Sequence, residues 1–175
     1  MCLLSILSVS TLLSLIIQDC IPPLNGLPST YILFPPILFT YGALSLRFVH
    51  MLALAAFTGF FTDLSAFQVV SGTIEIGIGW SIVAYSMLGT LMQYIRDKIL
   101  LREFWWPHSL LSAMCTFSLL SLHYVVIALH RDGISFNVNV LWRVCVPTVT
   151  SCLLFPVIGI PFTLLETILL PRKLG

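Results

Sequence analysis

Charged residues are scarce in this chain of 175 residues. Asp, Glu, Lys and Arg together make up 9% of the sequence, whereas 58% of the residues are hydrophobic. An ordinary soluble domain contains about 25% charged residues. A water-soluble fold of this length cannot bury so much apolar surface. The composition therefore argues against a soluble domain, and it predicts a single membrane domain over residues 1–175 whose outer surface contacts lipid.

Basic surfaces and catalytic motifs are also lacking. The formal net charge is +1, so we expect no patch for nucleic acid. The sequence contains no H-E-x-x-H motif, no phosphate-binding loop, no nucleophile motif and no dense cluster of carboxylates in an apolar run. None of the five cysteines forms a C-x-x-C pair. These absences argue against an enzyme, and they predict no catalytic residue, metal or cofactor.

The first 17 residues form an apolar run that lacks the basic start of a signal peptide. No Lys or Arg precedes Arg47, and the run is followed by QDCIPP rather than by a small-residue cleavage site. We therefore expect this run to be an uncleaved first membrane span.

Six apolar stretches are candidates for membrane-spanning helices, each of which needs roughly 20 apolar residues. They lie at about Cys2–Ile17, Tyr31–Leu46, His50–Val70, Ile76–Ile95, Pro107–Leu129 and Val140–Leu170. The last stretch carries three prolines, and it is compatible with one kinked helix or with a re-entrant piece followed by a helix. The sequence thus predicts an all-α, polytopic membrane protein with about six transmembrane helices.

The distribution of Lys and Arg predicts how these spans are oriented. Six spans place both termini on one side of the membrane, and six of the eight basic residues fall on that side. These six are Arg47, Arg96, Lys98, Arg102, Arg172 and Lys173, whereas Arg131 and Arg143 fall on the other side. By the positive-inside rule, we expect both termini to be cytoplasmic.

One acid, Asp63, lies in the long apolar run between His50 and Val70. A charge at the centre of a bilayer costs about 2.5–3.5 kcal/mol on insertion scales, so it seldom faces lipid. Helical spacing places Asp63 on one stripe with three small residues, which are Ala56, Gly59 and Ala66. Because small residues let helices approach closely in lipid, we expect this stripe to face protein.

The role of Asp63 stays open between three interpretations. In the first, its carboxylate accepts hydrogen bonds from a neighbouring helix or from a backbone loosened near the outer loop. In the second it contacts a partner or ligand, and in the third it acts as a proton relay or catalytic acid. The third role needs a second titratable group nearby. Glu75, Glu166 and Arg143 are the candidates for that group, and Glu75 is a candidate site residue at the outer end of the fourth span.

The third and fourth spans resemble those of the rod shape-determining protein MreD family. The third contains ALAAFTGFFTDLSAF, a turn with Gly72 follows, and the fourth contains GWSIVAYSMLGTLMQYIRDKIL. The family's motifs are G-x-x-x-D-L in the first of these spans and A-Y-x-x-G in the second. The matching positions are Gly59, Asp63 and Leu64, then Ala84 and Tyr85, with the glycine one residue later at Gly89. The early segment PPLNGLPSTYILFPPILFTYGAL is similar to the family's outer loop and second span.

The resemblance implies a non-enzymatic role in the cell-elongation machinery of the bacterial inner (plasma) membrane. An MreD-like protein binds a single-span periplasmic protein, MreC, and through it helps to connect the actin-like MreB to the wall synthases. It thereby helps to maintain rod shape and lateral peptidoglycan synthesis. The family also resembles, in its six-helix fold, the substrate-binding S components of energy-coupling-factor vitamin transporters. An S component with an outer polar pocket at Asp63, Glu75 and Asn137 is therefore the alternative function.

Overall fold

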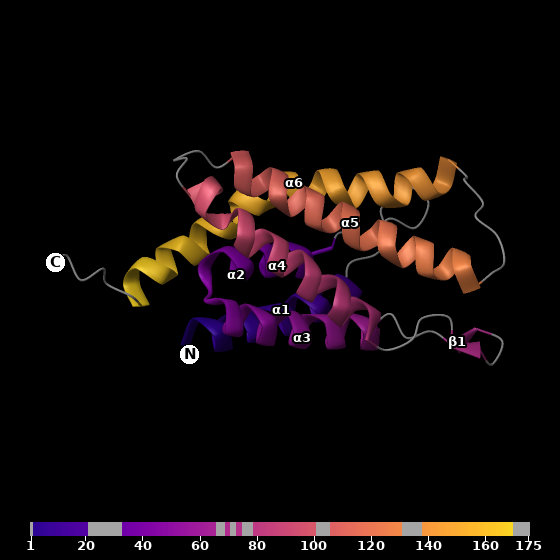
Figure 1. Cartoon of the computed structure of the whole chain (residues 1–175), viewed down its shortest axis with the longest axis horizontal. Helices are drawn as coiled ribbons and strands as arrows, with labels where there is room; N and C mark the ends of the chain where they lie inside the picture. Colours follow the sequence, from indigo (N-terminus) through magenta and orange to yellow (C-terminus); the bar gives the residue numbers. More distant parts are fainter. Residues whose placement is uncertain are drawn as a thin grey trace.

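The computed structural model describes residues 2–20, 33–65, 69–70, 73–74, 79–100, 106–130 and 138–169. Nearly all of these residues lie in helices, so the expectation of an all-α fold is confirmed (Figure 1). The helices are α1 (Cys2–Cys20), α2 (Pro35–Ser45), α3 (Phe48–Ser65), α4 (Trp80–Leu100), α5 (Trp106–His130) and α6 (Val138–Leu169). Two short antiparallel strands lie between α3 and α4 in the chain, and they are β1 (Val69–Val70) and β2 (Thr73–Ile74).

The helices run roughly along one direction, and α2 lies at the centre of the bundle. Helix α1 begins, and α6 ends, toward the same end of the molecule (Figure 1). Helix α2 contacts all five other helices, and every residue from Pro35 to Leu44 is buried. A helix that is apolar on all sides is typical of a buried position. The short α2 is therefore the core around which the longer helices pack.

The expected count of six membrane spans is not met. Among the described residues, three helical segments are long and apolar enough to cross a membrane, and they are Phe48–Ser65, Trp106–Ala128 and Val140–Leu165. Helix α1 contributes only the shorter apolar stretch Leu3–Gln18. Helix α2 has 11 residues, which is about 16 Å at 1.5 Å per residue, whereas the hydrocarbon core is about 30 Å thick. The fold nevertheless fits an all-α membrane protein.

Two helix boundaries differ from the expected ones for identifiable reasons. Helix α3 ends at Ser65 instead of continuing to Val70, and the β-branched pair Val69–Val70 forms β1. Helix α4 begins at Trp80 instead of Ile76. Gly79 has φ = 116°, a left-handed conformation that a right-handed helix cannot contain and that glycine adopts without steric cost.

The last apolar stretch is one helix, so the re-entrant alternative is not observed. Helix α6 runs from Val138 to Leu169 and contains Pro147, Pro156 and Pro161. Its yellow C-terminal part runs in a different direction from its orange first part (Figure 1). Proline lacks the backbone donor and clashes with the preceding turn, so these residues account for the bend.

Aromatic side chains from three helices fill the middle of the core. Phe39 of α2, Tyr85 of α4 and Phe155 of α6 are among the largest fully buried side chains. The rings of Phe39 and Tyr85 pack edge to face with their centroids 4.8 Å apart. A methyl group on Gly89 would collide with the side chains of Met51 and Phe39, so glycine at this position lets α4 approach α2 and α3.

Candidate functional site

The candidate site lies where α3 crosses the beginning of α4. Gly59 of α3 is buried at this crossing. A methyl group on Gly59 would lie 2.6 Å from both the backbone nitrogen and the Cα atom of Ile82 in α4. Real Cβ atoms do not approach backbone this closely, so any larger residue would push the two helices apart. The absence of a side chain at Gly59 therefore sets the distance between α3 and α4.

One turn further along α3, Asp63 is bonded to the start of α4. Its side chain is only 2% exposed. The Oδ2 atom accepts a hydrogen bond from the backbone N–H of Gly79 at 2.6 Å, and Oδ1 accepts one from the backbone N–H of Ser81 at 3.3 Å. The first N–H groups of a helix have no partner within that helix. Asp63 therefore caps α4 from a neighbouring helix.

Gly79 is the residue that makes this cap fit. The backbone carbonyl of Gly79 accepts the N–H of Val83 at 3.1 Å, so Gly79 is the N-cap residue of α4. Its left-handed φ of 116° turns the chain into the helix, and its own N–H meets the carboxylate. A negative charge at a helix N-terminus is also favoured by the helix dipole. These contacts explain why an acidic residue is retained in an apolar helix: its side chain caps the start of α4.

Ser81 extends the connection from α4 to α5. Its hydroxyl oxygen lies 2.8 Å from Nε2 of His123 in α5. Ser81 is fully buried and His123 is half-buried. Three helices are therefore joined in series through Asp63 of α3, Ser81 of α4 and His123 of α5. We call these three residues, together with Gly79, the α4 clamp.

The α4 clamp differs from a catalytic triad in its geometry. In a Ser–His–Asp triad the carboxylate bonds to the second imidazole nitrogen and orients the ring. Here both Asp63 oxygens accept hydrogen bonds from the backbone of α4, and the Ser81 side chain has no exposed surface for a substrate. The arrangement fits the first of the three interpretations, in which Asp63 is a hydrogen-bond acceptor between helices.

The other end of α4 caps α2 in a similar way. The amide nitrogen of Gln93 donates to the carbonyl oxygens of Ala43 at 2.6 Å and of Leu46 at 2.8 Å. The guanidinium of Arg96 donates to the same Leu46 oxygen at 3.1 Å. The last carbonyls of a helix lack partners within it, and a cation near them is favoured by the helix dipole. Helix α4 is therefore fixed to α3 at one end and to α2 at the other.

Helices α5 and α6 are joined by hydroxyl groups instead. Ser112 and Ser151 bring their hydroxyl oxygens to 2.9 Å, and Thr116 donates to the Ser151 hydroxyl at 2.9 Å. Thr116 also contacts the carbonyl of Ser112 at 3.0 Å. All three side chains are buried. This cluster is neutral and lies within the helices, so it stabilises packing without capping a helix end.

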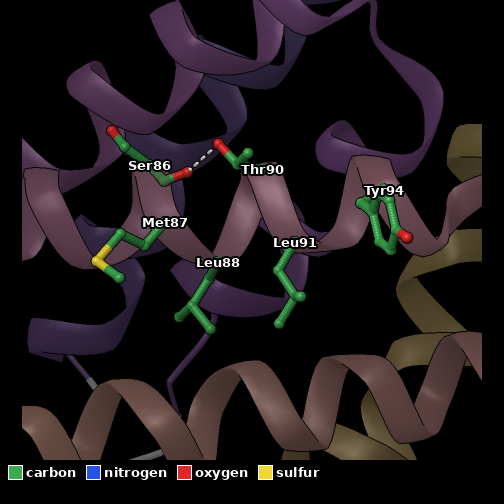
Figure 2. A pocket seen from close by; sticks show the side chains of 6 residues that line it. All are labelled: Ser86, Met87, Leu88, Thr90, Leu91 and Tyr94. Carbon is green, nitrogen blue, oxygen red and sulfur yellow. Dashed lines mark hydrogen bonds between the residues drawn. The ribbon is translucent and has the colours of Figure 1, made fainter.

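An open groove of about 670 Å³ follows the face of α4. Figure 2 shows the six α4 side chains that line it, which are Ser86, Met87, Leu88, Thr90, Leu91 and Tyr94. Three of these side chains carry a hydroxyl group, but the exposed lining surface is mostly apolar, and the hydroxyl of Thr90 is bonded back to the carbonyl of Ser86 at 2.8 Å. The groove therefore offers little hydrogen-bonding capacity.

The structure brings two of the five predicted site residues together and separates a third. Gly59 and Asp63 are both buried against α4. Ala56 is exposed, because the buried stripe of α3 passes through Ala55 instead. Ala66 and Glu75 lie outside the described residues.

Sequence reasoning missed the partners of Asp63. The predicted site residues include neither Ser81 nor His123. The available signal was the same for both residues. Each is a polar side chain inside an apolar segment, where a polar group usually has a protein partner. Pairing them required knowing which helices are neighbours.

Metal ligands do not gather in the described part of the chain, where no group of three His, Cys, Asp or Glu side chains is placed to hold an ion. Comparisons with protein-family models, curated proteins and solved structures found no match.

Proposed function

We propose that the chain is a non-enzymatic, MreD-like component of the bacterial cell-elongation machinery. In this role it lies in the inner membrane with both termini cytoplasmic and with the six-helix fold that the family shares with S components. It binds a single-span periplasmic protein of the MreC type, and it acts with MreB and the wall synthases to maintain rod shape.

The observation that carries this proposal is that residues of both sequence motifs are buried where α4 packs against its neighbours. In the G-x-x-x-D-L segment, Gly59 contacts the backbone of α4, and Asp63 caps that helix. In the A-Y-x-x-G segment, Tyr85 is fully buried against Phe39 of α2. The positions that carry the resemblance are therefore those that set how α3, α4 and α2 pack, which is the behaviour expected of family-defining residues in a scaffold protein.

In this proposal Asp63 supports partner binding without touching the partner. Its carboxylate is 2% exposed and both oxygens are occupied, so it is not free to contact a second protein. Asp63 instead fixes α4 relative to α3, and the surface formed by these two helices is what a partner would meet. Loss of Asp63 should therefore weaken partner binding through loss of this fixed arrangement.

The alternative function, an S component of a vitamin transporter, is less well supported. It requires a polar pocket lined by Asp63, whereas the Asp63 carboxylate points at the backbone of α4. The groove on α4 is mostly apolar, as expected for a surface in lipid and not for a site that binds a polar vitamin. The other two residues proposed for that pocket, Glu75 and Asn137, lie outside the described residues.

Purification of the tagged chain from its own membranes in a mild detergent, followed by mass spectrometry of the co-eluting proteins, tests the proposal. We expect a single-span periplasmic scaffold protein and wall synthases. The Asp63→Leu variant should recover less of that scaffold protein. Leu153→Ala is the control, because Leu153 lies on α6, away from α3 and α4, and is 67% exposed. Recovery of two ATPases with a second membrane subunit would instead identify a transporter component.

Depletion of the chain in living cells provides a second readout of the same proposal. Rod-shaped cells should become rounded as the protein is lost, because lateral wall synthesis would lose its organisation. Wild-type protein and Leu153→Ala should restore rods, and Asp63→Leu should not. Cells that keep their shape after complete depletion would contradict the proposed role.

A further inference from the structure

Two buried hydroxyl groups near the α3–α4 crossing have no hydrogen-bond partner within the described part of the chain. They belong to Thr58 of α3 and Tyr85 of α4, and both side chains are fully buried. Burial of a hydroxyl without a partner is costly, and native structures contain few such groups. The pair therefore indicates a binding site for a small hydrogen-bonding molecule inside the bundle.

The hydroxyl of Thr58 departs from the pattern of other threonines in these helices. A helical threonine commonly donates its hydroxyl to a backbone carbonyl in the preceding turn. Five threonines donate in this way to the residue four positions earlier, and they are Thr40, Thr62, Thr90, Thr116 and Thr148. Thr58 makes no such bond with any described residue. Its hydroxyl therefore keeps its donor and acceptor capacity for another group.

The packing of α3 on α4 brings the two hydroxyls to the same level as the Asp63 carboxylate. Gly59, the residue after Thr58, meets the backbone of Ile82, which lies one turn before Tyr85 in α4. Long side chains in a helix lean toward its N-terminus, so the Tyr85 hydroxyl reaches back toward the level of Ile82. Tyr85 is also close enough to Asp63 to interact with it electrostatically. Two hydroxyls and one carboxylate thus share one buried region.

We propose that one water molecule is bound between α3 and α4 by Asp63, Thr58 and Tyr85. Each Asp63 oxygen has a second lone pair beyond the one that accepts a backbone N–H of α4, so the carboxylate accepts one O–H of the water. The water donates its other O–H to the Thr58 oxygen and accepts the O–H of Tyr85. Buried waters typically make about three hydrogen bonds of this kind. Ala55 and Ala84, which are buried near these hydroxyls along α3 and α4, have small side chains, as a site for a water requires.

The sign of the stability change in two variants of unchanged side-chain shape tests the water site. Tyr85→Phe and Thr58→Val each remove one hydroxyl from the full-length chain. If the water is bound, each variant should raise the equilibrium constant of unfolding in detergent about fivefold, because a net hydrogen bond is lost. The double variant should raise it by less than the product of the two single effects, because the same water is lost in each. Tyr94→Phe is the control, because Tyr94 is 77% exposed, and it should leave the constant unchanged.

The opposite sign would overturn the proposal. A buried hydroxyl that lacks any partner destabilises the fold, so its removal should lower the equilibrium constant of unfolding. A constant that falls or stays unchanged in Tyr85→Phe or in Thr58→Val would therefore show that no water is bound by these groups.

X-ray footprinting of the full-length chain in isotopically labelled water distinguishes a bound water from a direct bond between side chains. X-rays convert a bound water into a hydroxyl radical, which oxidises the side chains that it touches. We expect Tyr85 to take up the labelled oxygen although it is fully buried, and Thr58→Val to reduce that uptake. Tyr41 of α2 is the control, because it is also a buried tyrosine, and it should stay unmodified. An unmodified Tyr85 in the wild-type chain would overturn the water site, and destabilisation by Tyr85→Phe would then indicate a direct bond to Asp63.

Discussion

The two helix pairs α3–α4 and α5–α6 are joined by different chemistry. In α3–α4 a carboxylate from one helix binds backbone N–H groups at the end of the other, and a glycine allows the backbones to touch. In α5–α6 three hydroxyl side chains contact one another within the helices. Both sets of contacts are buried, but only the contacts between α3 and α4 depend on a helix terminus.

This difference bears on how precisely each pair is positioned. A helix has a single N-terminus, so a carboxylate that needs its free N–H groups fixes the position of the two helices along their axes. A hydroxyl finds alternative acceptors in many carbonyls of an apolar helix, including its own preceding turn. We infer that α3–α4 is the precisely positioned pair, and that the contacts of α5–α6 add stability without specifying register.

The largest expected effect comes from replacing Asp63 with leucine. Asp63→Leu leaves the N–H groups of Gly79 and Ser81 without a partner, and each buried unsatisfied group costs about 1–3 kcal/mol. We expect the free energy of unfolding in detergent micelles to fall by about 3 kcal/mol or more, measured by denaturant titration. Asp63→Asn keeps one acceptor oxygen and should lose less. Equal stability of the wild type and Asp63→Leu would show that the α4 clamp does not hold α4.

The next largest effect is expected from a larger residue at Gly59. Gly59→Val brings side-chain atoms into the backbone of Ile82, and overpacking of this kind costs typically 1–3 kcal/mol. Cysteine pairs across α3 and α4 should also crosslink more slowly in this variant, since the helices are pushed apart. Ala56→Val is the control, because Ala56 lies one turn away and is exposed. If both substitutions change the free energy of unfolding equally, the close crossing at Gly59 does not limit how α3 and α4 pack.

The smallest effect is expected in the hydroxyl cluster of α5–α6. Hydrogen bonds between helices in lipid contribute about 0.6 kcal/mol on average. A double-mutant cycle with Ser112→Ala and Ser151→Ala should give a coupling free energy of that size, and each single variant should remain folded. A coupling as large as the loss in Asp63→Leu would remove the proposed distinction between the two helix pairs.

Much of the helical layout was predictable from apolar periodicity. Each of the six expected apolar stretches overlaps one helix, and the start of α5 at Trp106 falls one residue from its expected start. The length of α2 was not predictable, because an apolar run does not reveal whether it crosses a membrane or ends inside a core. Nor was the end of α3, since Val69 and Val70 suit a strand as well as an apolar helix.

The burial of Asp63 was predicted correctly, and its partners were not. The cost of an exposed charge in lipid and the nearby Gly59 were sufficient to expect a position facing protein. Gly59 and Asp63 lie on the buried stripe as expected, whereas Ala56 lies outside it and Ala55 is buried instead. One residue rotates a position by about 100° around a helix, and small residues on both sides of the true stripe made the choice ambiguous.

The sequence by itself determined that the chain is helical, that it suits an apolar solvent and that Asp63 must be paired with something. Those properties follow from composition, periodicity and the cost of a charge in lipid, all of which are local. The tertiary structure alone decided that the partners are the N–H groups of Gly79 and Ser81, and that His123 joins them from a third helix. Helix neighbours are chosen by packing over the whole bundle, and no single segment of sequence contains that choice.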